Sequence, residues 1–204
     1  MPSRNVNKEQ APDSYYHIYT RGANQQKIFL EAADYKYFLA LFERYLSNKS
    51  ALSKTGEPYP HYRGRVQLLA YCLMSNHLHL LVYQKDVPYL EKLMRSLMTS
   101  YSRYFNLKYQ RSGPLFESRY KAVRLDNDSY LQHITRYIHL NPRLWRNYRF
   151  SSLNYYLAGH EPQWLNTSMA LKLFASRADY LKFVADYEEQ KNMLSEFKYQ
   201  LANY

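Results

Sequence analysis

Residues 65–84, RVQLLAYCLMSNHLHLLVYQ, contain two apolar runs separated by a short polar link, Ser75-Asn76. Two such runs around a short link predict two antiparallel strands joined by a tight turn. Side chains of a strand alternate between its faces, so the apolar residues of the second run would point to one side. His77 and His79 would then lie together on the other side. This hairpin favours a fold that contains antiparallel strands.

The two histidines allow two interpretations. Their Cα atoms would lie about 6.8 Å apart in an extended strand, which lets both imidazoles bind one metal ion at nitrogen–metal distances of about 2.1 Å. Alternatively, His77 and His79 are two half-exposed side chains on a sheet face. The spacing alone leaves both interpretations open.

Periodicity along the chain predicts the remaining elements. We expect strands at 15–22, 65–74, 77–84 and 115–125, and helices at 31–48, 86–109 and 127–141. Asp126 or Asn127 would cap the third helix, and Pro142 would end it. The order β-α-β-β-α-β predicts an α+β, ferredoxin-like antiparallel sheet with helices packed on one face. A helical C-terminal extension, including a helix within 178–197, would follow.

The charge of the chain favours a polyanionic partner. Lys and Arg number 28 against 17 Asp and Glu, a net charge of +11. Residues 95–124 hold seven basic residues and one acid, a balance of +6, and residues 136–149 hold four arginines and no acid. Several of the 24 tyrosines lie among these cations, an arrangement typical of grooves that bind single-stranded nucleic acid. The expected DNA contacts are Arg21, Arg95, Arg103, Lys108, Arg111, Arg119, Lys121 and Arg124.

Composition also argues against several classes of protein. Cys72 is the single cysteine, so we expect neither a disulfide framework nor a thiolate metal cluster. The first 13 residues are polar, which predicts a loose leader and no secretory signal. No apolar run approaches membrane-spanning length. We therefore expect a cytoplasmic protein without a membrane partner.

The predicted third helix offers groups that could complete a metal site. Tyr137 and Asn141 are four residues apart and share one helix face, with His133 one turn earlier as a reserve ligand. Two imidazoles and an amide oxygen would suit Mg²⁺ or Mn²⁺ bridging to phosphate oxygens. A phenol, with a pKa of about 10, could then attack that phosphate and form a covalent tyrosyl-phosphate. The alternative is that Asn141 only ends a helix and Tyr137 is one tyrosine among many.

Several segments resemble one family in the same order along the chain. MSNHLHLL resembles the His-hydrophobic-His motif of HUH single-tyrosine transposases, and RYIHLNP resembles the segment that holds their nucleophile. YYHIYTRGANQQKIF, YSRYFNLKYQRSGPLFESRYKAV and RFSSLNYYLAG are also similar to segments of this group. The pattern is most like the branch of bacterial enzymes associated with repetitive extragenic palindromes.

This resemblance implies a residue-by-residue assignment. His77, His79 and Asn141 would hold Mg²⁺ or Mn²⁺, and Tyr137 would form a 5′-phosphotyrosine with single-stranded or hairpin DNA. Insertion-sequence relatives typically carry Gln where this chain has Asn141, which leaves the coordination open, although Asn is familiar in the branch associated with repetitive extragenic palindromes. The implied organisation is a leader at 1–13, a nuclease/transposase domain at 14–160 and a helical extension at 161–204, acting as a monomer or homodimer.

Other chemistries of paired histidines fit the sequence less well. A histidine-triad hydrolase would need a third histidine at Leu81, and a two-histidine phosphoesterase would need a second H-x-Ser/Thr motif. A replication initiator with paired tyrosines would need a tyrosine at position 141. The strongest rival is a domesticated protein that binds DNA or RNA hairpins without cleaving them.

Overall fold

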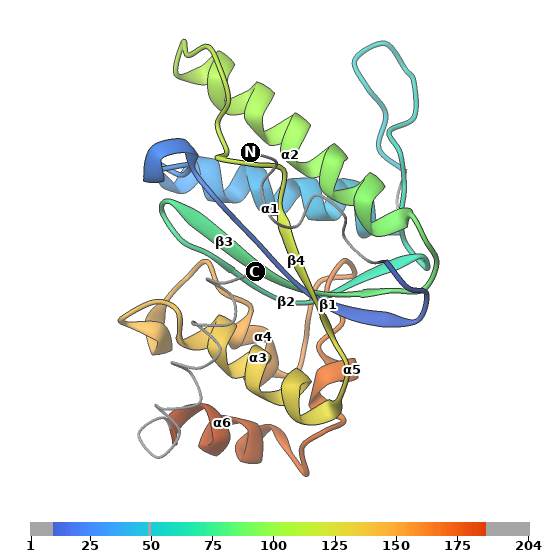
Figure 1. Ribbon diagram of the computed structural model, residues 1–204, viewed down its shortest axis with the longest axis vertical. Helices are drawn as coiled ribbons and strands as arrows, with labels where there is room; N and C mark the ends of the chain where they lie inside the picture. Colours follow the sequence, from blue (N-terminus) through green and yellow to red (C-terminus); the bar gives the residue numbers. More distant parts are fainter. Residues whose placement is uncertain (1–9, 49, 187–204) are drawn as a thin grey trace, which may run out of the picture.

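A four-stranded antiparallel sheet forms the middle layer of the molecule (Figure 1). The computed structural model describes residues 10–48 and 50–186. The strands lie in the order β2-β3-β1-β4. Their bounds are β1, Ser14–Arg21; β2, Val66–Leu73; β3, His77–Gln84; and β4, Lys121–Leu125. The predicted ferredoxin-like sheet is thereby confirmed.

The β2–β3 hairpin closes at the predicted link, where the backbone N–H of Met74 donates to the carbonyl of His77 at 2.8 Å. Strand β1 pairs with β3 on its other side, which makes β3 an inner strand. The register sets His79 opposite Cys72 on β2 and opposite Tyr19 on β1. Directly opposite residues share a face, so the residues around His79 come from three strands.

Helices α1 (Ala32–Leu46) and α2 (Tyr89–Lys108) cover one face of the sheet (Figure 1). The alternate apolar residues of β3, including Leu78 and Leu80, are buried beneath them. Asp34 joins the two helices: its buried carboxylate accepts from the backbone N–H of Glu31 at 3.1 Å and from Lys108 Nζ at 2.6 Å. These two helices fit the expectation of helices packed on one face.

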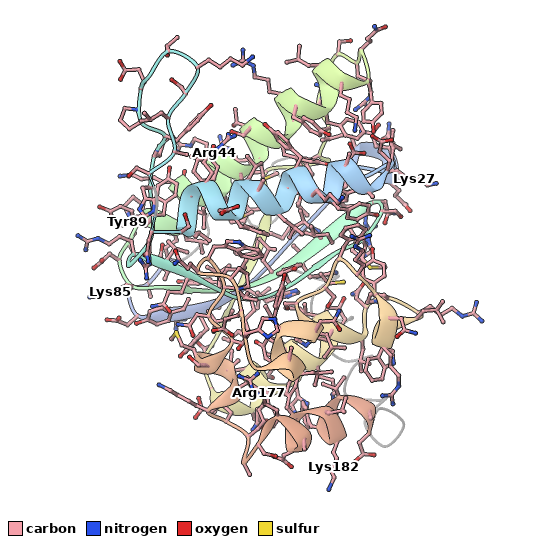
Figure 2. All side chains as sticks on the ribbon, turned by 180° about the vertical axis from the view of Figure 1, so that it is seen from behind. Lys27, Arg44, Lys85, Tyr89, Arg177 and Lys182 are labelled. Atoms are coloured by element: carbon pink, nitrogen blue, oxygen red, sulfur yellow. The ribbon has the colours of Figure 1, made fainter. Side chains whose placement is uncertain are left out.

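A second helical layer covers the opposite face, so the prediction of one helical face describes only α1 and α2. This layer comprises α3, Asp128–Leu140; α4, Leu153–Ala158; α5, Ser168–Leu171; and α6, Arg177–Ala185. Ile134 and Ile138 of α3 belong to the same buried cluster as Leu81 of β3. Arg177, which Figure 2 labels, donates to the carbonyl of Tyr156 at 2.6 Å and ties α6 to α4. The odd-numbered residues of β3 therefore face α3.

The predicted cap of α3 and the end of α3 agree with the structure. The side chain of Asn127 accepts from the backbone N–H of Tyr130 at 2.9 Å. The helix stops at Leu140, and buried Pro142 follows two residues later. The part of the expected C-terminal helix beyond residue 186 lies outside the described residues.

Two predicted boundaries are wrong. The strand expected at 115–125 begins only at Lys121, because the N–H of Glu117 donates to Arg21 and the carbonyl of Leu115 accepts from Ala23. Residues 115–117 thus pair with the last residue of β1 and the connection after it instead of extending β4. Helix α2 begins three residues after Asp86, which pairs with Arg65 at 2.6 Å.

Two short 3₁₀ helices complete the described elements: η1, Ala23–Gln25, follows β1, and η2, Trp145–Asn147, joins α3 to α4. Among the described residues, no helix is both long and apolar enough to cross a membrane.

Candidate active site

His77 and His79 point from β3 toward α3, as the alternation predicted. Their ring centroids lie 5.1 Å apart with the planes nearly perpendicular, at 84°. His79 is buried and His77 is half-buried. Two imidazoles thus share one face on an inner strand of the sheet.

Tyr137 of α3 and Asn141, which caps that helix, lie next to these histidines. The ring of Tyr137 lies edge-on to His79, with centroids 5.2 Å apart. Asn141 is the C-terminal cap residue of α3, and its Oδ1 atom lies 3.0 Å from Nε2 of His77. The four-residue spacing therefore brings a phenol and an amide to the two imidazoles.

The surroundings of His77 fit a cation. Its Nδ1 lies 2.7 Å from Oδ1 of Asn76, while its Nε2 faces Oδ1 of Asn141. Burial, together with Arg21, lowers the pKa of His77 despite the opposing hydrogen bond to Oδ1 of Asn141, so the ring is neutral near pH 7. A neutral imidazole has one N–H and can donate to only one of these two oxygens.

If the proton of His77 lies on Nδ1, a lone pair on Nε2 faces a lone pair of Asn141. Two ligands at about 2.1 Å on adjacent octahedral positions lie about 3 Å apart, which is the distance between these two atoms. The donor set of His77, His79 and Asn141 therefore suits a divalent cation.

A third histidine at the site, His17 of β1, was missed in the sequence. It is fully buried, and its Nε2 lies 3.0 Å from Nδ1 of His79 with the two rings stacked. Burial lowers the pKa of His17 to about 3. Burial, followed by His17, His77 and Arg21, also lowers that of His79. His17 and Tyr19 alternate along YYHIYTRG, but only the pairing of β1 with β3 shows that they share the face of His79.

His17 contacts Nδ1 of His79 and leaves Nε2 of His79 for a metal ion. His17 therefore orients this ring and does not add a ligand. Among residues 10–48 and 50–186, no three His, Cys, Asp or Glu side chains converge as a metal-binding group. The reserve ligand His133 instead contacts Arg136 at 2.9 Å and the ring of Phe183. The candidate set is thus two imidazoles and one amide.

Two phenols lie at this face. Burial raises the pKa of Tyr137, although the hydrogen bond with Asn141 and the charge of Arg21 lower it. Tyr19 stacks on His17 and His79 with centroids 5.5 and 6.1 Å apart, and burial raises its pKa to about 12. Both phenols are therefore protonated at neutral pH.

A buried network holds the helix that carries Tyr137. His139 points away from the phenol; its Nδ1 lies 2.5 Å from the hydroxyl of Tyr180 on α6 and its Nε2 lies 2.7 Å from Oγ of Ser152. The C-terminal helices thus support the orientation of α3.

The eight cations expected to bind DNA fall into separate groups. Arg21 lies opposite His77, and Lys121 lies opposite Tyr19 with Nζ 5.5 Å from that ring, so both share the histidine face. Arg95, Arg103 and Lys108 belong to α2 on the other face of the sheet. The others lie in or next to β4 and after α2: Arg111, Arg119 and Arg124. Only Arg21 and Lys121 adjoin the candidate site.

Several of these cations also have partners within the chain. Lys108 bonds to Asp34 and Glu31, and Arg124 pairs with Asp126 at 2.9 Å. Lys108 thus stabilises the packing of α1 against α2.

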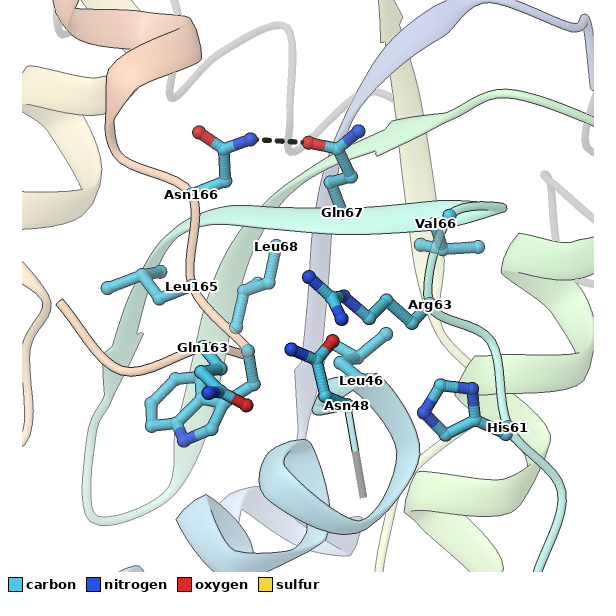
Figure 3. A pocket seen from close by; sticks show the side chains of 12 residues that line it. Leu46, Asn48, His61, Arg63, Val66, Gln67, Leu68, Gln163, Leu165 and Asn166 are labelled. Atoms are coloured by element: carbon cyan, nitrogen blue, oxygen red, sulfur yellow. Dashed lines mark hydrogen bonds between the residues drawn. The ribbon is translucent and has the colours of Figure 1, made fainter. Parts of the chain in front are cut away.

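A cavity of about 670 Å³ lies away from the histidines (Figure 3). Arg63 and Asn48 project into it beside Val66 and Leu68, at the start of β2. His79 pairs with Cys72 near the other end of that strand. The cavity therefore contains none of the predicted site residues.

A His-x-His strand facing a helix that bears a tyrosine is the arrangement that the resemblance to single-tyrosine transposases implied. Residues 61–141 match the family described as "Transposase IS200 like", a range that includes His77, His79, Tyr137 and Asn141. The resemblance to this family is thereby confirmed.

One similar solved structure is described as "Structure of the REP associates tyrosine transposase bound to a REP hairpin". It is 13% identical to this chain, with a TM-score of 0.54. The match covers 78% of this chain and 89% of that one. This likeness shows that the two chains share a fold. No curated protein matches the chain.

Proposed function

We propose that this protein is a metal-dependent single-stranded DNA nuclease and strand transferase that acts on palindromic hairpin DNA. Tyr137 is the nucleophile, and His77, His79 and Asn141 hold Mg²⁺ or Mn²⁺. The observation that carries the proposal is the meeting of His77 Nε2 and Asn141 Oδ1 at 3.0 Å beside Tyr137. The match to IS200-like transposases and the hairpin-bound structural neighbour support the substrate class.

The bound cation would supply charge that polarises and orients the scissile phosphate. Tyr137 provides the oxygen that bonds to phosphorus, while the P–O3′ bond breaks. The phenol loses its proton to solvent, and the leaving 3′ oxygen gains one. Its raised pKa keeps Tyr137 a weak nucleophile until substrate and cation are bound. Arg21 and Lys121 bind neighbouring phosphates on the same face.

The proposed nuclease unit comprises residues 14–160, and residues 161–204 extend it. Tyr180 and Val184 in the described part of this extension pack in the same buried cluster as α3. The extension therefore supports the helix that carries the nucleophile.

Incubation with single-stranded palindromic DNA and Mn²⁺, followed by a denaturing gel, tests the proposal. The parent chain should form a covalent adduct, and Tyr137→Phe should abolish the adduct while leaving DNA binding nearly intact. Tyr19→Phe is the matched control, because it removes the other phenol at the site and should retain the adduct. An adduct in Tyr137→Phe that is lost in Tyr19→Phe would assign the nucleophile to Tyr19.

Two further measurements separate the proposal from its rival, a hairpin-binding protein that does not cleave. His77→Ala should lose cleavage, and excess Mn²⁺ should restore part of it, whereas Mn²⁺ cannot replace the missing phenol of Tyr137→Phe. Binding should weaken steeply with salt, because phosphate contacts release counterions. DNA binding by the parent without any adduct would favour the rival.

A further inference from the structure

The segment that joins α3 to α4, residues 143–149, has the sequence RLWRNYR. It begins two residues after Asn141 and lies outside the range that matches the transposase family. Its three arginines, Arg143, Arg146 and Arg149, are all exposed, and the segment holds no acid. None of them was among the DNA contacts expected from the sequence.

The C-terminal end of this segment is attached to the end of β2, beside the candidate site. The hydroxyl of Tyr148 donates to the carbonyl of Leu73 at 2.6 Å, and the N–H of Leu73 donates to Phe150 at 2.9 Å. Leu73 ends β2, just before the turn that leads to His77. In Figure 1 the segment projects at the left edge, below the turn between β2 and β3. These contacts with Leu73 therefore hold the segment at the end of the sheet where the β2–β3 turn leads to His77.

The projecting part combines charge with an exposed apolar surface. Leu144 is 78% exposed, the largest value among the exposed large hydrophobic residues in the described part of the chain. The guanidinium of Arg146 lies 4.2 Å from the ring centroid of Trp145, which makes a flat cationic surface. For Arg143 and Arg149, no ion pair with any residue of 10–48 or 50–186 is found.

Nucleobases stack on aromatic rings and on guanidinium planes, while phosphates pair with arginine. A leucine held in solvent between cations suits contact with a base better than contact with a stem backbone. An acidic protein partner could pair with the arginines, but it would not explain the stacking of Arg146 on Trp145.

We propose that residues 143–149 bind the single-stranded DNA flank beside the phosphate that Tyr137 attacks. Arg143, Arg146 and Arg149 contact phosphates, while Leu144 and the Trp145–Arg146 pair contact a base. This inference rests on the proposed function and names the part of the protein that holds the strand at the site.

The test compares two fluorescently labelled DNA hairpins, one with a single-stranded flank and one without it. Arg143→Ala/Arg146→Ala removes two phosphate contacts, and Leu144→Ser removes the exposed apolar contact. Arg63→Ala and Leu52→Ser are matched controls, because Arg63 is exposed at the far end of β2 and Leu52 is 63% exposed. All five substituted residues are exposed, so melting temperatures should stay near that of the parent.

Fluorescence anisotropy over a range of salt concentrations gives the affinity and its salt dependence. The double variant should bind the flanked hairpin at least about tenfold more weakly, with a salt slope smaller by about 1.4 for two contacts to a single strand. Leu144→Ser should lose about fivefold at an unchanged slope, within the lower range for one base contact. Neither control should change, and affinity for the unflanked hairpin should be preserved.

Parent-like affinity and slope in the double variant would overturn this inference, while an adduct formed by the parent would leave the proposed function standing. Equal losses on the two hairpins would overturn the assignment to the flank. A parent chain that binds neither hairpin would contradict both proposals.

Discussion

Replacing His17 by leucine should weaken metal binding without unfolding the protein. A cation on Nε2 of His79 requires the proton on Nδ1, which then donates to Nε2 of His17 across 3.0 Å. His17→Leu leaves this buried N–H without an acceptor, at a cost of about 1–3 kcal/mol. Loss of such a supporting partner typically lowers metal affinity about 10–100-fold.

The fold should tolerate the change, since His17 itself has a buried Nδ1 with no hydrogen-bond partner among the described residues. Leucine removes that group, and in the metal-free protein His79 can carry its proton on the other nitrogen. The free energy of unfolding without metal should therefore change little.

Isothermal titration of the full chain with Mn²⁺ measures the effect directly. His160→Leu is a suitable control, because this histidine is exposed and follows α4, away from β3. The control should bind Mn²⁺ as the parent does. Parent-like Mn²⁺ affinity in His17→Leu would refute the role assigned to the hydrogen bond.

Three further changes test other parts of the structure. Asn141→Ala should lower Mn²⁺ affinity in the same titration and abolish the covalent adduct, with an unchanged melting temperature. Gly22→Ala should destabilise the fold by about 1–3 kcal/mol, seen in thermal melts, because the new Cβ would lie 2.2 Å from the carbonyl oxygen of Gln26. Burial alone would raise the pKa of Asp34, but hydrogen bonds, first among them that from Lys108, lower it below 3.8. Its stabilisation is thus complete above about pH 5 and is lost as the pH falls through the lowered pKa; Asp34→Asn should cost about 3 kcal/mol at neutral pH and flatten the acid side of a melt-against-pH profile.

The parts of the candidate site that follow from local spacing could be predicted from the sequence. Strand alternation predicted that His77 and His79 share one face of the sheet. Helix periodicity predicted that Tyr137 and Asn141 share one face of a helix. His17 could not be found in this way, because it meets His79 through the register of two strands separated by 62 positions. Such a register depends on how the sheet closes, and local patterning does not encode it.

The charge pattern indicated a basic protein, but it did not indicate which cations lie beside the histidines. Seven of the eight expected DNA contacts came from residues 95–124, a strongly basic stretch. The buried apolar side of a helix fixes the direction in which its charged side chains point. Helix α2 packs on the face of the sheet away from the histidines, so its cations lie on that side (Figure 1). Lys108 and its acidic partners further show that a cation in a basic stretch can serve the core.

The bonds of His139 to Tyr180 and Ser152 bear on how the protein is made. A ribosome delivers the N-terminal part of a chain first, and domains fold as their residues emerge. Strand β3 and helix α3 would both be synthesised about 40 residues before Tyr180, whose hydroxyl contacts His139 on the side of α3 away from Tyr137. During synthesis the incomplete chain would therefore hold Tyr137 loosely, and the proposed cleavage would become possible only when α6 docks.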